Sequence, residues 1–154
     1  MLTMRCSWFF RVLVAFACGL VPLAAVGDDV GQLKVVKGAV SLERGGQRLP
    51  VQPGTLVQVS DTIITGADGS AGIAFVDNSL LSVGPNSVLA IDRYAFNSTT
   101  HEGVFDSALR KGTLSVISGK IAKQSPDAMK VKTPSSILGA RGTEFLVRVS
   151  DGTQ

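Results

Sequence analysis

Short stretches of alternating apolar and polar residues follow one another from residue 33 onward, and none sustains the 3.6-residue period of a helix. Glycine, proline, asparagine and aspartate separate them at spacings of about eight to twelve residues, which is typical of all-β proteins. This pattern predicts an all-β fold, either a wrapped roll or sandwich or a β-solenoid. The expected strands cover residues 33–36, 39–43, 56–59, 62–65, 72–76, 80–83, 88–91, 104–109, 114–117, 129–132 and 145–148.

Some of the expected strands are apolar on both faces. Residues 63–64, 73–76 and 80–81 place apolar side chains at consecutive positions. Because successive side chains of a strand point to opposite faces, we expect these strands to be covered on both sides.

The first 27 residues have the pattern of a secretory signal peptide. Arg5 and Arg11 precede an unbroken run of apolar and small residues at positions 12–21, and small residues lead up to Gly27. A basic start, a short apolar segment and small residues before the cleavage point are the parts of such a peptide. We therefore expect cleavage between Gly27 and Asp28.

The expected mature domain covers residues 28–154 and is periplasmic or secreted. The apolar segment at positions 12–27 is shorter than the roughly 20 residues that span a bilayer, so no mature membrane span is expected. A lipoprotein anchored at Cys18 is the alternative. Phe16 and the lack of a leucine three residues before Cys18 fit a lipobox poorly.

Removing the leader changes the charge and the cysteine content. The whole chain has 15 Lys and Arg against 12 Asp and Glu; Arg5 and Arg11 lie in the leader, which leaves 13 against 12, a net charge of +1. A duplex-binding surface usually needs a concentrated basic face, so no nucleic-acid partner is expected. Both cysteines, Cys6 and Cys18, also lie in the leader, so the fold is expected to rely on its core.

The sequence assigns no catalytic, metal-binding or cofactor-binding residue. His101 is the only histidine and lies in a polar loop, without the cysteine or second histidine of a metal site. Asp61, Asp68, Asp77 and Asp127 stand beside turn-forming residues, where carboxylates cap backbone N–H groups, and their spacing matches no calcium loop. We therefore expect a protein that is not an enzyme and has no cofactor.

Seven segments, in order along the chain, resemble motifs of the FecR domain family. The chain departs from the family pattern at Ser60 and Asn78, where glycine is usual, and asparagine tolerates a positive φ. The segments are residues 38–42, 60–66, 69–75, 77–87, 109–114, 131–134 and 141–145. The last of them is the signature turn and strand, Arg141, Gly142, Thr143, Glu144 and Phe145.

The resemblance implies a periplasmic, non-enzymatic domain that acts by protein–protein contact in envelope signalling. In well-known members the domain follows a cytoplasmic anti-sigma segment and a membrane helix, neither of which the sequence shows. It therefore resembles the stand-alone exported members, and the sigma-regulator activity is not carried over. The alternative is a structural, envelope-associated protein that binds glycan, peptidoglycan or other acidic polymers through its loops and Lys120, Lys123, Lys130 and Lys132.

The C-terminal strand is the expected site of contact with an unidentified protein partner. Phe145, Val147 and Val149 share one face of it, with Arg148 opposite. Family members usually continue with another strand, so a truncated reading, in which that last strand is missing, is one of three alternatives. Either earlier parts of the chain pair with the strand on both sides, or Leu146, Val147 and Arg148 form an open edge that accepts a partner strand.

Overall fold

The computed structural model describes residues 27–140 and 144–150, and strands dominate them. The strands are β1 (Asp29–Lys37), β2 (Val40–Arg44), β3 (Gln47–Pro50), β4 (Leu56–Gln58), β5 (Thr62–Thr65), β6 (Ser70–Phe75), β7 (Leu80–Val83), β8 (Val88–Phe96), β9 (Gly103–Ile117), β10 (Met129–Lys132), β11 (Ile137–Gly139) and β12 (Glu144–Val149). Between β9 and β10 lie the helix α1 (Lys120–Gln124) and the 3₁₀ turn η1 (Pro126–Ala128). The predicted all-β class is confirmed.

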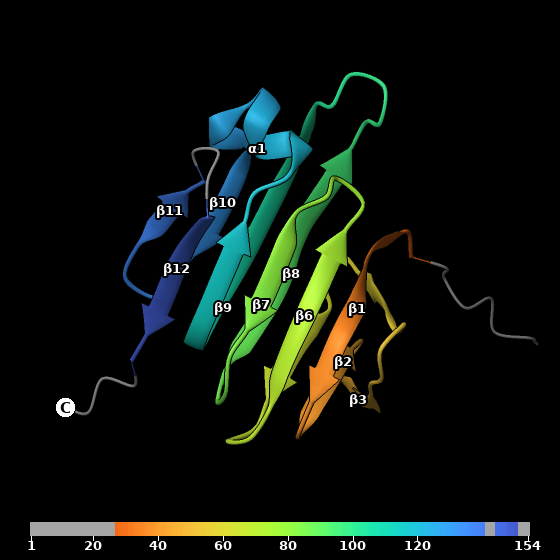
Figure 1. Cartoon of the computed structure of the whole chain (residues 1–154), viewed down its shortest axis with the longest axis vertical. Coiled ribbons are helices and arrows are strands. Elements are labelled where there is room, and N and C mark those ends of the chain that lie inside the picture. The colour runs from red at the N-terminus through yellow and green to blue at the C-terminus, as the bar shows by residue number, and fades with distance from the viewer. Residues whose placement is uncertain (1–26, 141–143, 151–154) are drawn as a thin grey trace, which may run out of the picture.

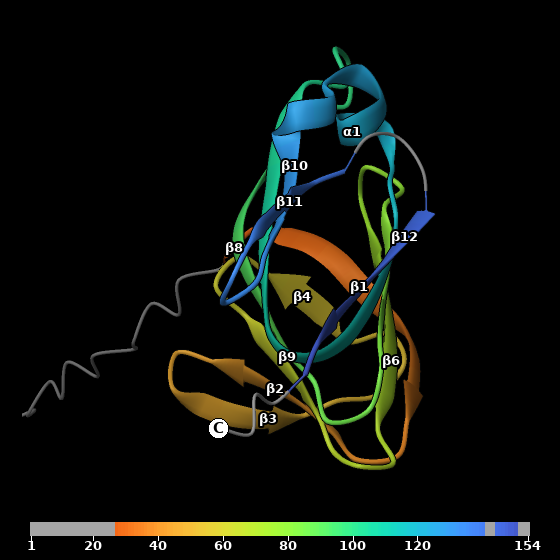
Figure 2. The same ribbon diagram turned by 90° about the vertical axis from the view of Figure 1, so that its left-hand side faces the viewer.

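The strands form one sheet that curls into a half-barrel, which is the wrapped form among the expected architectures. Its main path runs β3-β2-β5-β8-β9-β7-β6-β1-β4; β10 and β12 branch from it at β9, and β11 pairs with β10. Figure 2 shows β9 curving from the layer of β8 and β10 to the layer of β6 and β12. Because one strand belongs to both layers, the side chains between the layers form a single core.

The core consists of the inward-facing side chains of nearly every strand. Phe105 is wholly buried in it, with its ring tilted against Phe75 at a centroid distance of 4.5 Å and edge-on to Tyr94 at 5.1 Å. Such aromatic clusters bury a large apolar area in a small domain. The other largest wholly buried side chains are those of Leu33, Leu42, Ile63, Ile73, Leu81, Leu89, Ile91, Leu109, Leu114, Ile121 and Met129.

The strand β9 is longer than the sequence pattern predicts. We expected two strands, at 104–109 and 114–117, and the structure forms one strand of 15 residues. Gly112 interrupts the apolar pattern, but its φ of 92° lets the backbone bend there without ending the strand. The bend is the point at which β9 passes from one layer to the other.

Three elements are absent from the sequence-based prediction. The strands β3 and β11 are short and exposed throughout, so they carry no buried alternation. The helix α1 has five residues and no side-chain cap, and its first N–H, from Lys120, donates to the Asp77 carbonyl at 2.8 Å. β3 and β11 each pair with the preceding strand across a short turn, at residues 45–46 and 133–136, whereas α1 is held by a tertiary contact.

Ser60 and Asn78, which replace glycines usual in the related family, keep the glycine-like backbone. Their φ angles are 72° and 67°, in the left-handed region. Asn78 lies in the turn between β6 and β7, where its N–H donates to the Phe75 carbonyl at 3.0 Å. Both departures therefore preserve the turn geometry.

The expectation that β5, β6 and β7 are covered on both faces is wrong. In each strand only alternate residues are buried, and the residues between them are partly or wholly exposed. Leu80 shows this most clearly, since 44% of it remains accessible. The outer face of these strands carries apolar side chains that the fold itself does not cover.

Candidate functional site: the free edge of β12

The strand β12 lies at an edge of the sheet (Figure 1). It pairs antiparallel with β9, from Glu144 opposite Ile117 to Val149 opposite Gly112. No other strand among residues 27–140 and 144–150 pairs with it. Every second residue of β12 therefore directs its backbone N–H and C=O away from β9, where another strand could bond to them.

The side chains of β12 alternate as the sequence predicts. Val147 is 5% exposed and belongs to the core, and Phe145 and Val149 pack against that core. Leu146 is 65% exposed on the opposite face, between the exposed side chains of Glu144 and Arg148. Of the predicted edge residues, Leu146 and Arg148 thus present side chains to solvent, whereas the Val147 side chain is buried.

The exposed apolar residues around β12 lie in register across the outer face of the sheet. Leu80 of β7 stands opposite Ile117 of β9, and Ile117 stands opposite Glu144 of β12. Leu146 continues the neighbouring row, opposite Ser115. Leu80 and Ile117 are 44% and 43% exposed, so an apolar strip leads from the sheet to its free edge.

A hollow opens beside β12 because β9 leaves part of its edge unpaired. The strand β10 pairs with residues 105–108 of β9 and β12 pairs with residues 112–117, so in the described chain no strand pairs with 109–111 on this edge. Arg110 and Arg148 line the resulting hollow of about 440 Å³ together with Thr133.

The hollow is positively charged. The structure records no ion pair for Arg110 or Arg148 with any described residue. Lys132, one of the lysines expected to form a basic face, is instead partly neutralised, since its Nζ lies 3.5 Å from an Asp92 oxygen. The positive charge of the hollow therefore comes from the two arginines.

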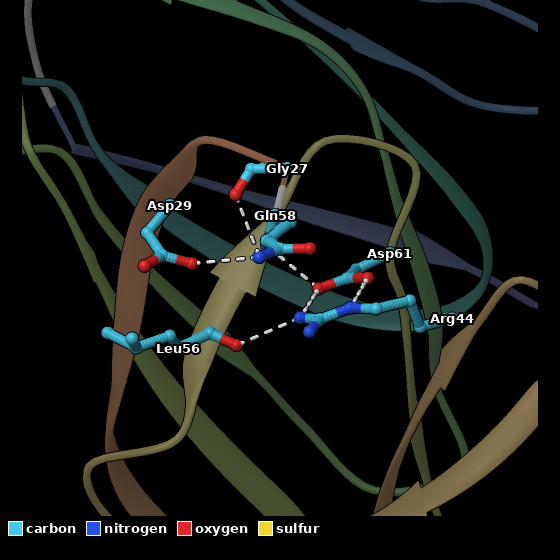
Figure 3. A network of polar contacts seen from close by, with 6 residues as sticks. All are labelled: Gly27, Asp29, Arg44, Leu56, Gln58 and Asp61. Atoms are coloured by element: carbon cyan, nitrogen blue, oxygen red, sulfur yellow. Dashed lines mark hydrogen bonds and ion pairs between the residues drawn. The ribbon is translucent and has the colours of Figure 1, made fainter. Parts of the chain in front are cut away.

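An ion pair between the partly exposed Arg44 and the buried Asp61 fixes the opposite end of the sheet, where β2, β4 and β5 meet (Figure 3). Arg44 donates from Nε and a terminal nitrogen to the two Asp61 oxygens, at 2.8 and 2.6 Å. Asp61 is fully buried and also accepts the Gln58 N–H at 2.7 Å. The hydrogen bonds to Asp61 raise the pKa of Arg44 above its usual value, so this pair is structural.

A second buried carboxylate, Asp77, joins the turn between β6 and β7 to β8 and to the chain that enters α1. It accepts hydrogen bonds from the Ser79 hydroxyl at 2.7 Å and from the Tyr94 hydroxyl at 3.1 Å. Ser79 in turn accepts the Gly119 N–H at 2.9 Å, which holds the chain entering α1. Burial raises the pKa of Tyr94, and the negative charge of Asp77 adds to this effect. Tyr94 therefore stays protonated and serves as a fixed donor.

The comparisons with known proteins agree with the resemblance seen in the sequence. A family model described as FecR protein matches residues 61–154, which is more than half of the chain. The chain belongs to the FecR family. Domains of this family are regulatory and signalling modules, with no known enzymatic activity. Searches of curated proteins and of solved structures each gave no match.

The FecR-like motifs coincide with the turns that hold the fold. Asp61 and Asp77 accept backbone N–H groups of their own turns, as the sequence predicts, and Asp68 accepts the Ala39 N–H at 3.3 Å. Sequence reasoning missed that Asp61 and Asp77 are fully buried. The position of each aspartate between two apolar strands could have indicated that its side chain is buried.

Several residues named from the sequence lie outside the described part of the FecR chain. These are Arg141, Gly142 and Thr143 of the signature turn, and Cys18 with the rest of residues 1–26. Gly27 and Asp28, at the expected cleavage point, are described, and the Gly27 carbonyl accepts a hydrogen bond from Gln58 at 2.9 Å. Within the described ranges, no helix is long and apolar enough to cross a membrane.

The polar loop between β8 and β9 presents no catalytic arrangement. His101 has a φ of 60° and its ring stacks on Phe96, with centroids 6.2 Å apart. No group of three or more metal-ligating side chains occurs among the described residues. The free edge of β12 and the arginine hollow are therefore the features of this FecR domain from which a function can be argued.

Proposed function

We propose that this FecR domain is an exported, periplasmic or secreted, non-enzymatic module that acts in envelope signalling by binding another protein through the free edge of β12. Export is proposed from the N-terminal signal pattern, which predicts a mature N-terminus at Asp28. The signalling role is proposed from the family.

The observation that carries the proposal is the exposure of the β12 backbone next to apolar side chains. A strand added to β12 would gain main-chain hydrogen bonds along the free edge. It would also cover Leu146, whose side chain is 65% exposed. Proline and bulges commonly block the edges of sheets; β12 contains no proline and pairs with β9 without a bulge.

Proline scanning of β12 tests this mechanism. Leu146→Pro and Val147→Pro each remove one backbone donor, and only one of the two donors points away from β9. The variant at the outward donor should lose capture of envelope proteins in crosslinking pull-downs while still melting cooperatively. Arg48→Pro, on the edge strand β3 of the other layer, is the control and should keep capture, because Arg48 stands at a non-hydrogen-bonded pair with Glu43 and its N–H points away from β2.

Two results would contradict the proposed contact. In the first, both β12 variants capture protein as the native chain does, so the edge backbone is not used. In the second, neither variant melts cooperatively, so the free edge is needed for folding rather than for binding.

The arginine hollow favours a second candidate function, attachment to glycan or another acidic envelope polymer. Guanidinium groups bind carboxylates and phosphates through paired hydrogen bonds, and Arg110 and Arg148 lack such partners in the described chain. On this reading, Arg110→Gln should lower retention on peptidoglycan or acidic polysaccharide several-fold. Arg93→Gln, which removes an exposed arginine already 3.6 Å from Asp106, should not. Equal retention of both variants would exclude the hollow as the binding site.

A further inference from the structure

We propose that the strand that pairs with β12 is β12 of a second copy of this chain. The two strands run antiparallel about a two-fold axis at Leu146 and join the two sheets into one. This inference rests on the proposed use of the β12 edge and names its occupant. It is carried by the order of side chains along β12 and by their exposure.

The charges of β12 are arranged symmetrically about Leu146. Glu144 lies two residues before it and Arg148 two residues after it, and all three side chains are exposed on the same face. In an antiparallel pair centred on Leu146, Glu144 of each copy stands opposite Arg148 of the other. Opposite charges at directly paired positions stabilise a sheet, so the interface contains two such pairs.

The apolar residues of β12 fit the same register. Leu146 meets its own symmetry mate at the axis, which covers the most exposed apolar side chain of the strand. Phe145 and Val147 of one copy stand opposite Val147 and Phe145 of the other and extend the inner face. An interface in which one patch meets itself is the usual arrangement of a closed dimer.

The pattern also selects the orientation. In a parallel pair in register, Glu144 stands beside Glu144 and Arg148 beside Arg148, and like charges at paired positions destabilise a sheet. The antiparallel pair is therefore favoured over the parallel pair, because it forms both opposite-charge pairs and the contact between the two Leu146 side chains. Closure by two-fold symmetry also pairs the free β12 edge of each copy, so no third chain can add at β12.

Charge reversal tests the inference by sedimentation equilibrium of the purified protein. Glu144→Arg and Arg148→Glu each place two like-charged pairs across the axis and should raise the dimer dissociation constant on the order of tenfold or more. An equimolar mixture of the two variants should dimerise again, because each strand of one variant then faces opposite charges. The double variant Glu144→Arg/Arg148→Glu should also dimerise.

Lys37→Glu and Glu102→Arg are the matched controls, because they make the same changes in charge at exposed positions outside β12. They should leave the dissociation constant unchanged. The inference is overturned if the native chain is monomeric at every concentration measured, if both single variants dimerise like the native chain, or if their mixture stays monomeric.

The dimer and the proposed function can fail separately. If the native chain is monomeric but a proline in β12 still abolishes capture of envelope proteins, the dimer is excluded and the proposed function stands.

Discussion

Replacing Arg44 with leucine is expected to lower the free energy of unfolding by about 3–5 kcal/mol, the range for a buried charge left without its partner. Asp61 is wholly buried, and Arg44 supplies two of its hydrogen bonds. In the variant, the Gln58 N–H remains as a donor to this carboxylate. One amide donor does not replace the solvation of a charge that has been removed from water.

Replacing Asp61, the other partner of the ion pair, should lower the free energy of unfolding by less. In Asp61→Asn the group left without a partner is Arg44, whose side chain is 37% exposed and can be solvated. We expect a loss of about 2 kcal/mol, the scale of a hydrogen bond to a charged group. The double variant Arg44→Leu/Asp61→Asn should be more stable than Arg44→Leu alone, because it no longer buries a charge.

Urea unfolding of the four proteins measures these differences as a double-mutant cycle. The expected order of stability is the native chain, Asp61→Asn, the double variant and then Arg44→Leu. If Arg44→Leu proved as stable as the native chain, the ion pair would contribute nothing and the description of this corner of the sheet would be wrong.

Replacing Gly112 with alanine is expected to destabilise the domain by about 3 kcal/mol or more, since backbone strain and overpacking each cost about 1–3 kcal/mol. Gly112 has a φ of 92°, which L-residues rarely adopt. A Cβ placed there would lie 2.0 Å from the Ser87 Oγ and 2.5 Å from the Ser87 Cα. Because the second contact is with backbone, β8 or the bend in β9 would have to move.

Gly45→Ala is the matched control for this prediction. Gly45 also has a positive φ, of 57°, but no atom lies within 4 Å of the place that a Cβ would occupy, so only about 1 kcal/mol of strain is expected. Thermal and urea unfolding of both variants compare the two costs. Equal destabilisation would show that the contact with Ser87 is unimportant and that β9 can bend in another way.

The sequence located the strands that have one buried face and clear turn signals. The expected bounds of 62–65, 80–83 and 129–132 agree with β5, β7 and β10. The pattern failed for β9, because Gly112 resembles a turn residue locally and bends the strand only in its tertiary setting. It also failed for β3 and β11, which have no buried side to produce alternation.

The candidate site was predictable only in part. The alternation of Phe145, Val147 and Val149 identified a half-buried strand, and the structure adds that β9 covers one edge of it. The hollow could not be predicted, because Arg110 and Arg148 are far apart in sequence and meet only through the bend in β9. Exposed Leu80 lies on the same outer face of the sheet as Leu146. This placement depends on strand register, which short apolar runs do not specify.

Site-specific photocrosslinking from β12 tests the central claim most directly. A photoreactive amino acid is placed at Leu146 in the exported protein, and at Leu49 as a control on the edge strand β3, whose side chain is also exposed. The account predicts protein adducts from position 146, with the mass of a second copy if β12 pairs with itself, and none from position 49. Adducts from position 49 with none from position 146 would contradict a contact through the free edge of β12.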